Sequence, residues 1–141
     1  MLVRLLYASH LVDENMADIV KSVMQQSREK NPQYGITGIL CHSDKVFLQV
    51  LEGGRVQVNN LYAHILKDKR HTDIILLNYE EIDERRYAGW TMGEANLNKI
   101  NPSILLKYSA SPTLSPHFMS GKMSLSLIED LIASAAIVCR M

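Results

Sequence analysis

The chain has 141 residues, 47% of them hydrophobic, which is enough for one domain with a well-buried core. Fifteen basic residues balance fifteen acidic ones without a block of like charge, so the composition indicates neither a nucleic-acid surface nor an electrostatic membrane anchor. No stretch reaches the roughly eighteen apolar residues of a membrane span and the first residues are too soon polar for a signal peptide, so we expect a cytoplasmic protein without a membrane partner.

The first elements are a strand and an amphipathic helix. Residues 2–9 are rich in β-compatible side chains and predict the strand. Apolar residues then recur with helical spacing over 16–27, and we expect this helix to end near Asn31-Pro32 because proline restricts the residue before it.

The next elements are a hairpin, a second helix and two further strands. Residues 35–41 and 46–51 predict the hairpin, and the helical stripe over 58–66 predicts the second helix. Residues 73–79 and 90–95 predict strands four and five. The order β-α-β-β-α-β-β indicates an α+β, ferredoxin-like sheet with both helices on one face, in which strands one and three are neighbours and parallel.

The rest of the chain predicts a helical cover for the other face of the sheet. That face is apolar through Leu6, Leu48 and Val50, and residues 102–108 and 119–138 have helical patterns. We therefore expect two units, a sheet domain over residues 1–96 and a C-terminal helical extension over residues 97–141.

A polar residue, Gln49, interrupts the otherwise apolar run over 46–51. A strand of this kind is covered on both faces, and a buried amide without a partner costs about 1–3 kcal/mol. The partner is a core water, a hydroxyl such as that of Tyr7 at a similar height on strand one, or a bound ligand.

Five ordered blocks of residues share their spacing with a known family. They are Arg4-Leu5-Leu6-Tyr7-Ala8-Ser9; Asn31 followed by Gly35-Ile36-Thr37-Gly38-Ile39-Leu40; Phe47-Leu48-Gln49-Val50-Leu51-Glu52-Gly53; Asp68-Lys69-Arg70-His71; and Arg85-Arg86-Tyr87-Ala88-Gly89-Trp90-Thr91-Met92. Over about residues 2–96 the chain resembles a BLUF domain, the flavin-binding blue-light receptor module. The residues after Asn96 resemble, less specifically, the two-helix extension of short stand-alone BLUF proteins.

The resemblance implies a non-covalently bound flavin, FAD or alternatively FMN, and a photoactive pair. Tyr7 matches the tyrosine that donates an electron and a proton to the excited flavin. Gln49 matches the glutamine between that tyrosine and the flavin, whose amide changes its hydrogen bonds by rotation or tautomerisation. A core tyrosine and an edge-strand glutamine are the alternatives.

Four further residues match flavin-binding positions of the family. Asn31 matches the asparagine that holds the polar edge of the flavin ring, although it could simply end the first helix. Arg70 and His71 match a pair near the ribityl phosphate, and a charge cluster at a helix end also accounts for them. Ser9 is the least specific of the four. Some family members have a second polar residue at the position of Pro32, so a contact from that side chain is missing in this chain.

Trp90 and Met92 match the photoactive tryptophan and methionine of strand five, although an ordinary apolar pair is the alternative. Alternation along a strand would point both to the same side, so an exchange between them would need a register shift.

The sequence predicts no metal site. His64, Asp68 and His71 have a spacing that could bind a metal, but a solvated helix face accounts for it better. Cys41 and Cys139 are far apart and are expected to be reduced thiols.

These observations predict a blue-light sensor without catalytic output. Light would drive transient electron and proton transfer from Tyr7 and leave Gln49 rearranged with a red-shifted flavin spectrum. The signal would pass through strand five and the C-terminal helices to a homo-oligomer interface or a downstream protein. The alternative is a flavin-dependent redox enzyme on the same ferredoxin-like scaffold. An acylphosphatase-like hydrolase is disfavoured because residues 9–15 contain no glycine and no arginine for a phosphate-binding loop.

Overall fold

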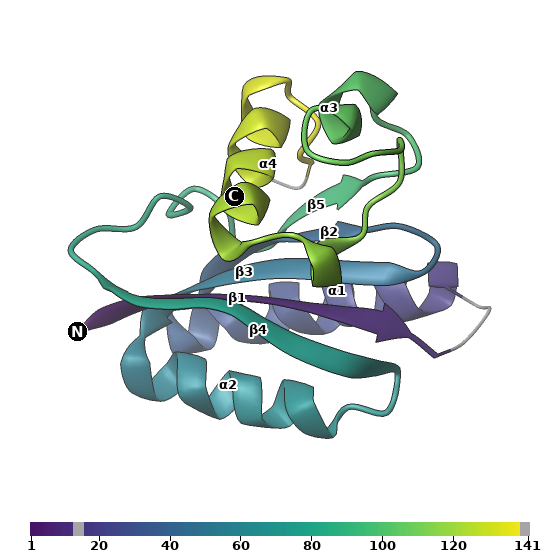
Figure 1. Ribbon diagram of the computed structural model, residues 1–141. Coiled ribbons are helices and arrows are strands. Elements are labelled where there is room, and N and C mark those ends of the chain that lie inside the picture. The colour runs from purple at the N-terminus through teal and green to yellow at the C-terminus, as the bar shows by residue number, and fades with distance from the viewer. Residues whose placement is uncertain (13–15, 139–141) are drawn as a thin grey trace.

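A computed structural model of the chain describes residues 1–12 and 16–138 and shows one sheet with helices on both faces (Figure 1). The strands are β1 (Leu2–Leu11), β2 (Thr37–His42), β3 (Val46–Gly54), β4 (His71–Ile82) and β5 (Gly93–Asn96). The helices are α1 (Met16–Tyr34), α2 (Arg55–Lys67), α3 (Pro102–Leu106) and α4 (Gly121–Ala133), with a short 3-10 helix, η1 (Pro116–Phe118). The predicted ferredoxin-like α+β fold is confirmed.

The strand order is β4-β1-β3-β2-β5. β1 and β3 are neighbours, as expected, but they are antiparallel, so the predicted parallel pairing is wrong. The physical reason is the hairpin, because β3 reverses the direction of β2 and then inserts between β2 and β1. β5 pairs in parallel with β2, and β4 forms the opposite edge.

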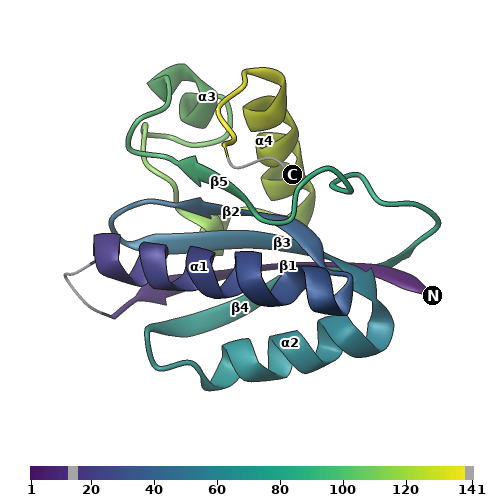
Figure 2. The same ribbon diagram turned by 180° about the vertical axis from the view of Figure 1, so that it is seen from behind.

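Helices α1 and α2 cover one face of the sheet (Figure 2). α1 continues through Pro32 and ends at Tyr34, later than the sequence predicted, and Gly35 follows with a positive φ of 65°, a conformation that glycine adopts without strain. The buried residues under these helices form a first core: Val3, Leu5, Tyr7, Ile19, Val20, Met24, Ile36, Leu40, Phe47, Leu51, Val58 and Met92.

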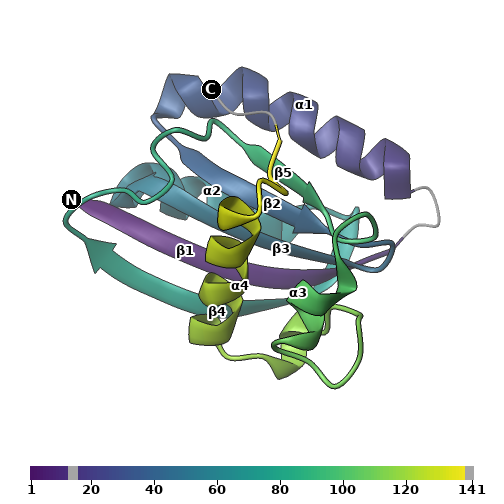
Figure 3. The ribbon, with the colours of Figure 1, turned by 90° about the horizontal axis from the view of Figure 1, so that it is seen from above.

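The C-terminal extension covers the other face, as expected, and α4 crosses the strands there (Figure 3). A side chain at Gly121 would lie 2.3 Å from the carbonyl oxygen of Leu77, so glycine allows the first turn of α4 to rest on β4. The α4 residues Leu127, Ile128 and Leu131 are fully buried in a second core. Its sheet members are Leu6, Ala8, Ile39, Cys41, Val46, Leu48, Val50 and Ala95.

β5 begins at Gly93, so the predicted start at Trp90 is wrong. Cys41 is buried and free, and Cys139 lies outside the described residues. Among the described helices, none has the length and apolarity needed to cross a bilayer. The division into domains at residue 96 stays a prediction.

Candidate functional site

The phenol of Tyr7 and the amide of Gln49 meet across neighbouring strands. Tyr7 on β1 pairs directly with Gln49 on β3, which places both side chains on the face that α1 and α2 cover. The Tyr7 hydroxyl donates to Gln49 Oε1 over 2.5 Å, and both residues are buried. The antiparallel register thus supplies the hydroxyl partner that the buried amide requires.

The Tyr7 hydroxyl keeps its proton at neutral pH. Burial raises its pKa far above the usual range, and the negative charge of Asp68 raises it further. Since the phenol stays protonated, it is the donor in the bond to Gln49.

The nitrogen of the Gln49 amide has a weak partner. Nε2 donates to Met92 Sδ over 3.4 Å, and a thioether sulfur is a poor acceptor. Met92 is completely buried. Gln49 therefore combines one strong hydrogen bond with donor capacity that the described residues satisfy poorly.

Met92 and Trp90 lie on opposite faces of the sheet, so the prediction that they share a side is wrong. Met92 belongs to the core under α1 and α2, whereas Trp90 packs against the core under α4. The segment is not yet a strand here, because the Trp90 N–H donates to the Tyr87 carbonyl in a turn and the Trp90 carbonyl accepts from Gly38. The two residues therefore connect the Gln49 side of the sheet to the α4 side.

Asn31 lies in the last turns of α1, buried at 4% exposure. Its Nδ2 donates to the Thr91 carbonyl over 3.3 Å, and its own carbonyl accepts from Ile36. Asn31 is thus tied to the segment that carries Met92 and does more than end a helix.

Ser9 and His71 form a buried pair beside Tyr7. His71 Nε2 lies 2.8 Å from the Ile65 carbonyl, and Nδ1 lies 2.8 Å from Ser9 Oγ. Because a carbonyl only accepts, Nε2 carries the proton and Nδ1 accepts from Ser9. The His71 ring stands edge-on to Tyr7, with 6.1 Å between ring centroids.

Arg70 lies between α2 and β4 and links this loop to α1. It pairs with both carboxylate oxygens of Asp68, and this pairing lowers the pKa of Asp68. Its other nitrogens donate to Ser22 Oγ at 2.9 Å and Gln26 Oε1 at 3.1 Å on α1. The sequence pattern does not predict these two α1 partners, since polar residues are common on an exposed helix face.

Apolar side chains around Tyr7 remain incompletely covered. They come from both helices and are Val23, Leu61, Tyr62 and Ile65. The centroid of the Tyr62 ring lies 5.9 Å from that of the Tyr7 ring, a contact that the sequence pattern does not predict. The predicted α2 stripe is thus fully buried only at Val58, and the other apolar side chains of the stripe keep exposed surface.

The possible metal spacing on α2 is not realised. Asp68 and His71 lie beyond the end of α2, and His71 is engaged with Ser9 and Ile65.

Comparison with known proteins identifies the family of the chain. The family model for BLUF, sensors of blue-light using FAD, matches residues 2–93. The chain belongs to the BLUF family. The cofactor of this family is a flavin, as expected from the sequence.

The curated relatives of this BLUF protein are longer. Photoactivated adenylate cyclase subunit beta of Euglena longa is 38% identical over 77 residues, which cover 54% of this chain and 9% of that protein. The blue light- and temperature-regulated antirepressor BluF of Escherichia coli is 32% identical over 101 residues, 70% of this chain and 25% of that protein. The chain thus spans a quarter or less of these two relatives.

Two solved structures match almost the whole BLUF protein, including its extension. BlsA in its photo-activated state has a TM-score of 0.83 and 30% identity, and the match covers 94% of this chain and 95% of that one. BlrB in its dark state has a TM-score of 0.75 and 32% identity, with 95% and 96% coverage.

The residues around Tyr7 fit a flavin. A flavin ring is flat and largely apolar with hydrogen-bonding groups along one edge. The site offers partly exposed apolar side chains, the poorly satisfied Gln49 nitrogen and the Asn31 amide. The apolar side chains match the flat surface of such a ring, and the two amides match its hydrogen-bonding edge.

Proposed function

We propose that this BLUF protein is a blue-light receptor in which Tyr7 and Gln49 convert light absorption into a change of hydrogen bonding. The observation that carries the proposal is their buried 2.5 Å hydrogen bond beside the poorly satisfied Gln49 nitrogen. When bound, the flavin supplies the absorption of blue light and an acceptor for one electron.

Tyr7 is the proposed source of the electron and of a proton. A phenol that loses an electron becomes strongly acidic, and Gln49 Oε1 is already in contact with the hydroxyl. After both return to Tyr7, the Gln49 amide is left rotated or in its other tautomer, which exchanges its donor and acceptor ends. The Nε2 contact with Met92 is weak, so giving it up costs little.

The proposed binding residues surround this pair. Gln49 and Asn31 would hydrogen-bond the polar edge of the ring, and Tyr7 would pack beside it. Arg70 and His71, supported by Ser9, would lie near the ribityl-phosphate part. Arg70 is the cation of this group and is 32% exposed, so a phosphate could compete with Asp68 for it. FAD is the proposed flavin, with FMN as the alternative.

The proposed output is a change in association rather than catalysis. Met92 touches Gln49, and Trp90, in the same short segment, packs under α4, so a rearranged amide has a physical route to the extension. The proposed receiver is a second copy of the chain or a downstream protein in the cytoplasm. The match to a family of light sensors does not favour the redox-enzyme alternative.

The test is the dark-minus-light absorption spectrum of the purified protein. We expect a reversible red shift of the flavin bands in the wild type. Tyr7→Phe should still bind flavin, because the ring still packs, but should not form the red-shifted state. A normal photocycle in Tyr7→Phe would refute the proposed role, and bleaching coupled to substrate turnover would favour the redox enzyme.

A further inference from the structure

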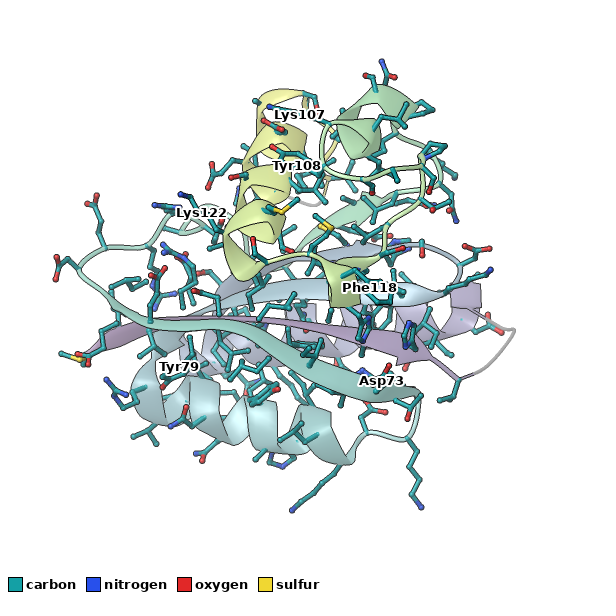
Figure 4. The ribbon with its side chains drawn as sticks, viewed as in Figure 1. Asp73, Tyr79, Lys107, Tyr108, Phe118 and Lys122 are labelled. Carbon is teal, nitrogen blue, oxygen red and sulfur yellow. The ribbon has the colours of Figure 1, made fainter. Side chains whose placement is uncertain are left out.

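Three side chains of metal-binding type meet where the C-terminal extension touches the end of β1. His10 comes from β1, Asp73 from β4 and His117 from η1, and one ligand atom from each lies within 4.8 Å of the others. Along β1, His10 shares its face with Leu6 and Ala8, opposite to that of Tyr7. Figure 4 labels Asp73 on the edge strand β4 and Phe118, the residue after His117. The cluster is distinct from the flavin site.

Asp73 holds both imidazoles. His10 Nδ1 lies 2.9 Å from Asp73 Oδ2, and His117 Nε2 lies 2.7 Å from the Asp73 carbonyl oxygen and 3.6 Å from Oδ2. Because the carbonyl only accepts, His117 Nε2 carries the proton.

The tautomer of His117 can change. Its Nδ1 is buried without a hydrogen-bond partner in the described part of the chain, so the ring proton can move there and leave Nε2, which lies 3.6 Å from Asp73 Oδ2, free to bind an ion. Asp73 and His10 are 64% and 44% exposed, so an ion can reach the cluster from water.

We propose that His10, Asp73 and His117 bind one divalent transition-metal ion of the Zn²⁺ class. Two imidazoles and a carboxylate are a ligand set that such ions accept, with water completing the coordination. The His10 and His117 rings are stacked, with 4.1 Å between centroids and 6° between planes, so their lone pairs do not yet converge. Binding turns the half-exposed His10 ring out of this stack, and the proton on its ligating nitrogen is released or moves to the other ring nitrogen.

A bound ion would fix the extension to the sheet. η1 carries His117, and the other two ligands belong to β1 and β4, so the ion would cross-link three segments that are distant in sequence. Phe118, next to His117, is 93% exposed, and its backbone would become more rigid. This role does not depend on the flavin or on light.

The experiment is a calorimetric titration of the 141-residue chain with ZnCl₂ in the dark. We expect one equivalent to bind in the wild type. His10→Ala and Asp73→Asn should each weaken binding at least about tenfold, since even losing a supporting contact of a metal site costs that much. Asparagine is chosen because Asp73 has a positive φ of 53°, which asparagine tolerates.

Two control variants separate this site from other zinc ligands. His64→Ala removes an exposed histidine of α2, and Cys139→Ser removes a thiol, and both should bind Zn²⁺ as the wild type does. Hydrogen exchange over residues 116–118 should slow with Zn²⁺ in the wild type but not in His10→Ala. The proposal is overturned if the wild type binds no stoichiometric Zn²⁺, if His10→Ala binds it unchanged, or if Cys139→Ser abolishes binding.

Discussion

Tyr87→Phe should disconnect the light signal from α4 while leaving the flavin site intact. Tyr87 is fully buried, and its backbone N–H donates to Glu52 Oε1 over 2.7 Å. Its hydroxyl donates to Glu129 Oε1 of α4 over 3.2 Å. Through the turn that ends at Trp90, Tyr87 thus joins the segment that carries Met92 to the extension.

The size of the effect follows from the contacts of this hydroxyl. Glu129 is 48% exposed, so water can replace the lost bond and the cost in unfolding free energy should be about 0.5–1.5 kcal/mol. A signal of this kind needs a coupling of about 1–3 kcal/mol. If the coupling free energy falls by about 1 kcal/mol, the light-dependent change in α4 hydrogen-exchange rates should fall by about fivefold.

The assay is hydrogen exchange of α4 in the dark and under blue light. Tyr108→Phe is the matched control, because the Tyr108 hydroxyl donates to Asp130, the next residue of α4, but from within the extension (Figure 4). Both variants should keep the wild-type spectral shift and lose a similar, small amount of dark stability. Only Tyr87→Phe should lose the light-dependent change.

A light-dependent change of wild-type size in Tyr87→Phe would refute this reasoning, because the hydroxyl bond would then carry none of the coupling. An equal loss in both tyrosine variants would also refute it, since the effect would then reflect a loosened extension.

Three further variants test other parts of the molecule. Gln49→Leu should fold and bind flavin but show no red shift in the dark-minus-light spectrum, and a wild-type shift would identify a different switch. Asn31→Ala should lower flavin occupancy, because each lost hydrogen bond weakens the binding free energy by about 1 kcal/mol. Full flavin occupancy in the purified variant would mean that Asn31 has only a structural role. Glu52→Gln should lower the unfolding free energy by about 3–5 kcal/mol in urea denaturation, because the 4%-exposed Arg4 loses its buried ion pair. A loss below about 1 kcal/mol would mean that Glu80 alone satisfies Arg4.

The helices and the adjacency of β1 and β3 were predictable because they follow from local periodicity and from the order of the elements along the chain. The direction of β3 relative to β1 was available from the hairpin and was nevertheless predicted wrongly. The start of β5 could not be predicted from the sequence. Trp90-Thr91-Met92 alternates like a strand, but hydrogen bonds of Trp90 with Tyr87 and Gly38 hold the segment in a turn. Tertiary hydrogen bonds decide the structure there.

The central pair of the site was predictable, whereas its surroundings were not. Gln49 stood out because it is polar in an apolar run, and its height on the strand matched that of Tyr7. The partners of Arg70 on α1 depend on how two helices sit on the sheet, and the sequence pattern carries no such information. The cluster of His10, Asp73 and His117 likewise forms only once η1 folds back onto the sheet.

The cover that α4 provides has a consequence for synthesis of the chain on the ribosome. All five strands are complete by Asn96, but the buried apolar residues of α4 lie between Leu127 and Leu131. At about 5–20 residues per second, the residues from Leu97 to Ala133 take roughly 2–7 s to be made. During that time Leu6, Leu48 and Val50 remain without their cover, so the nascent chain should be most prone to aggregation, and most dependent on chaperones, in this interval.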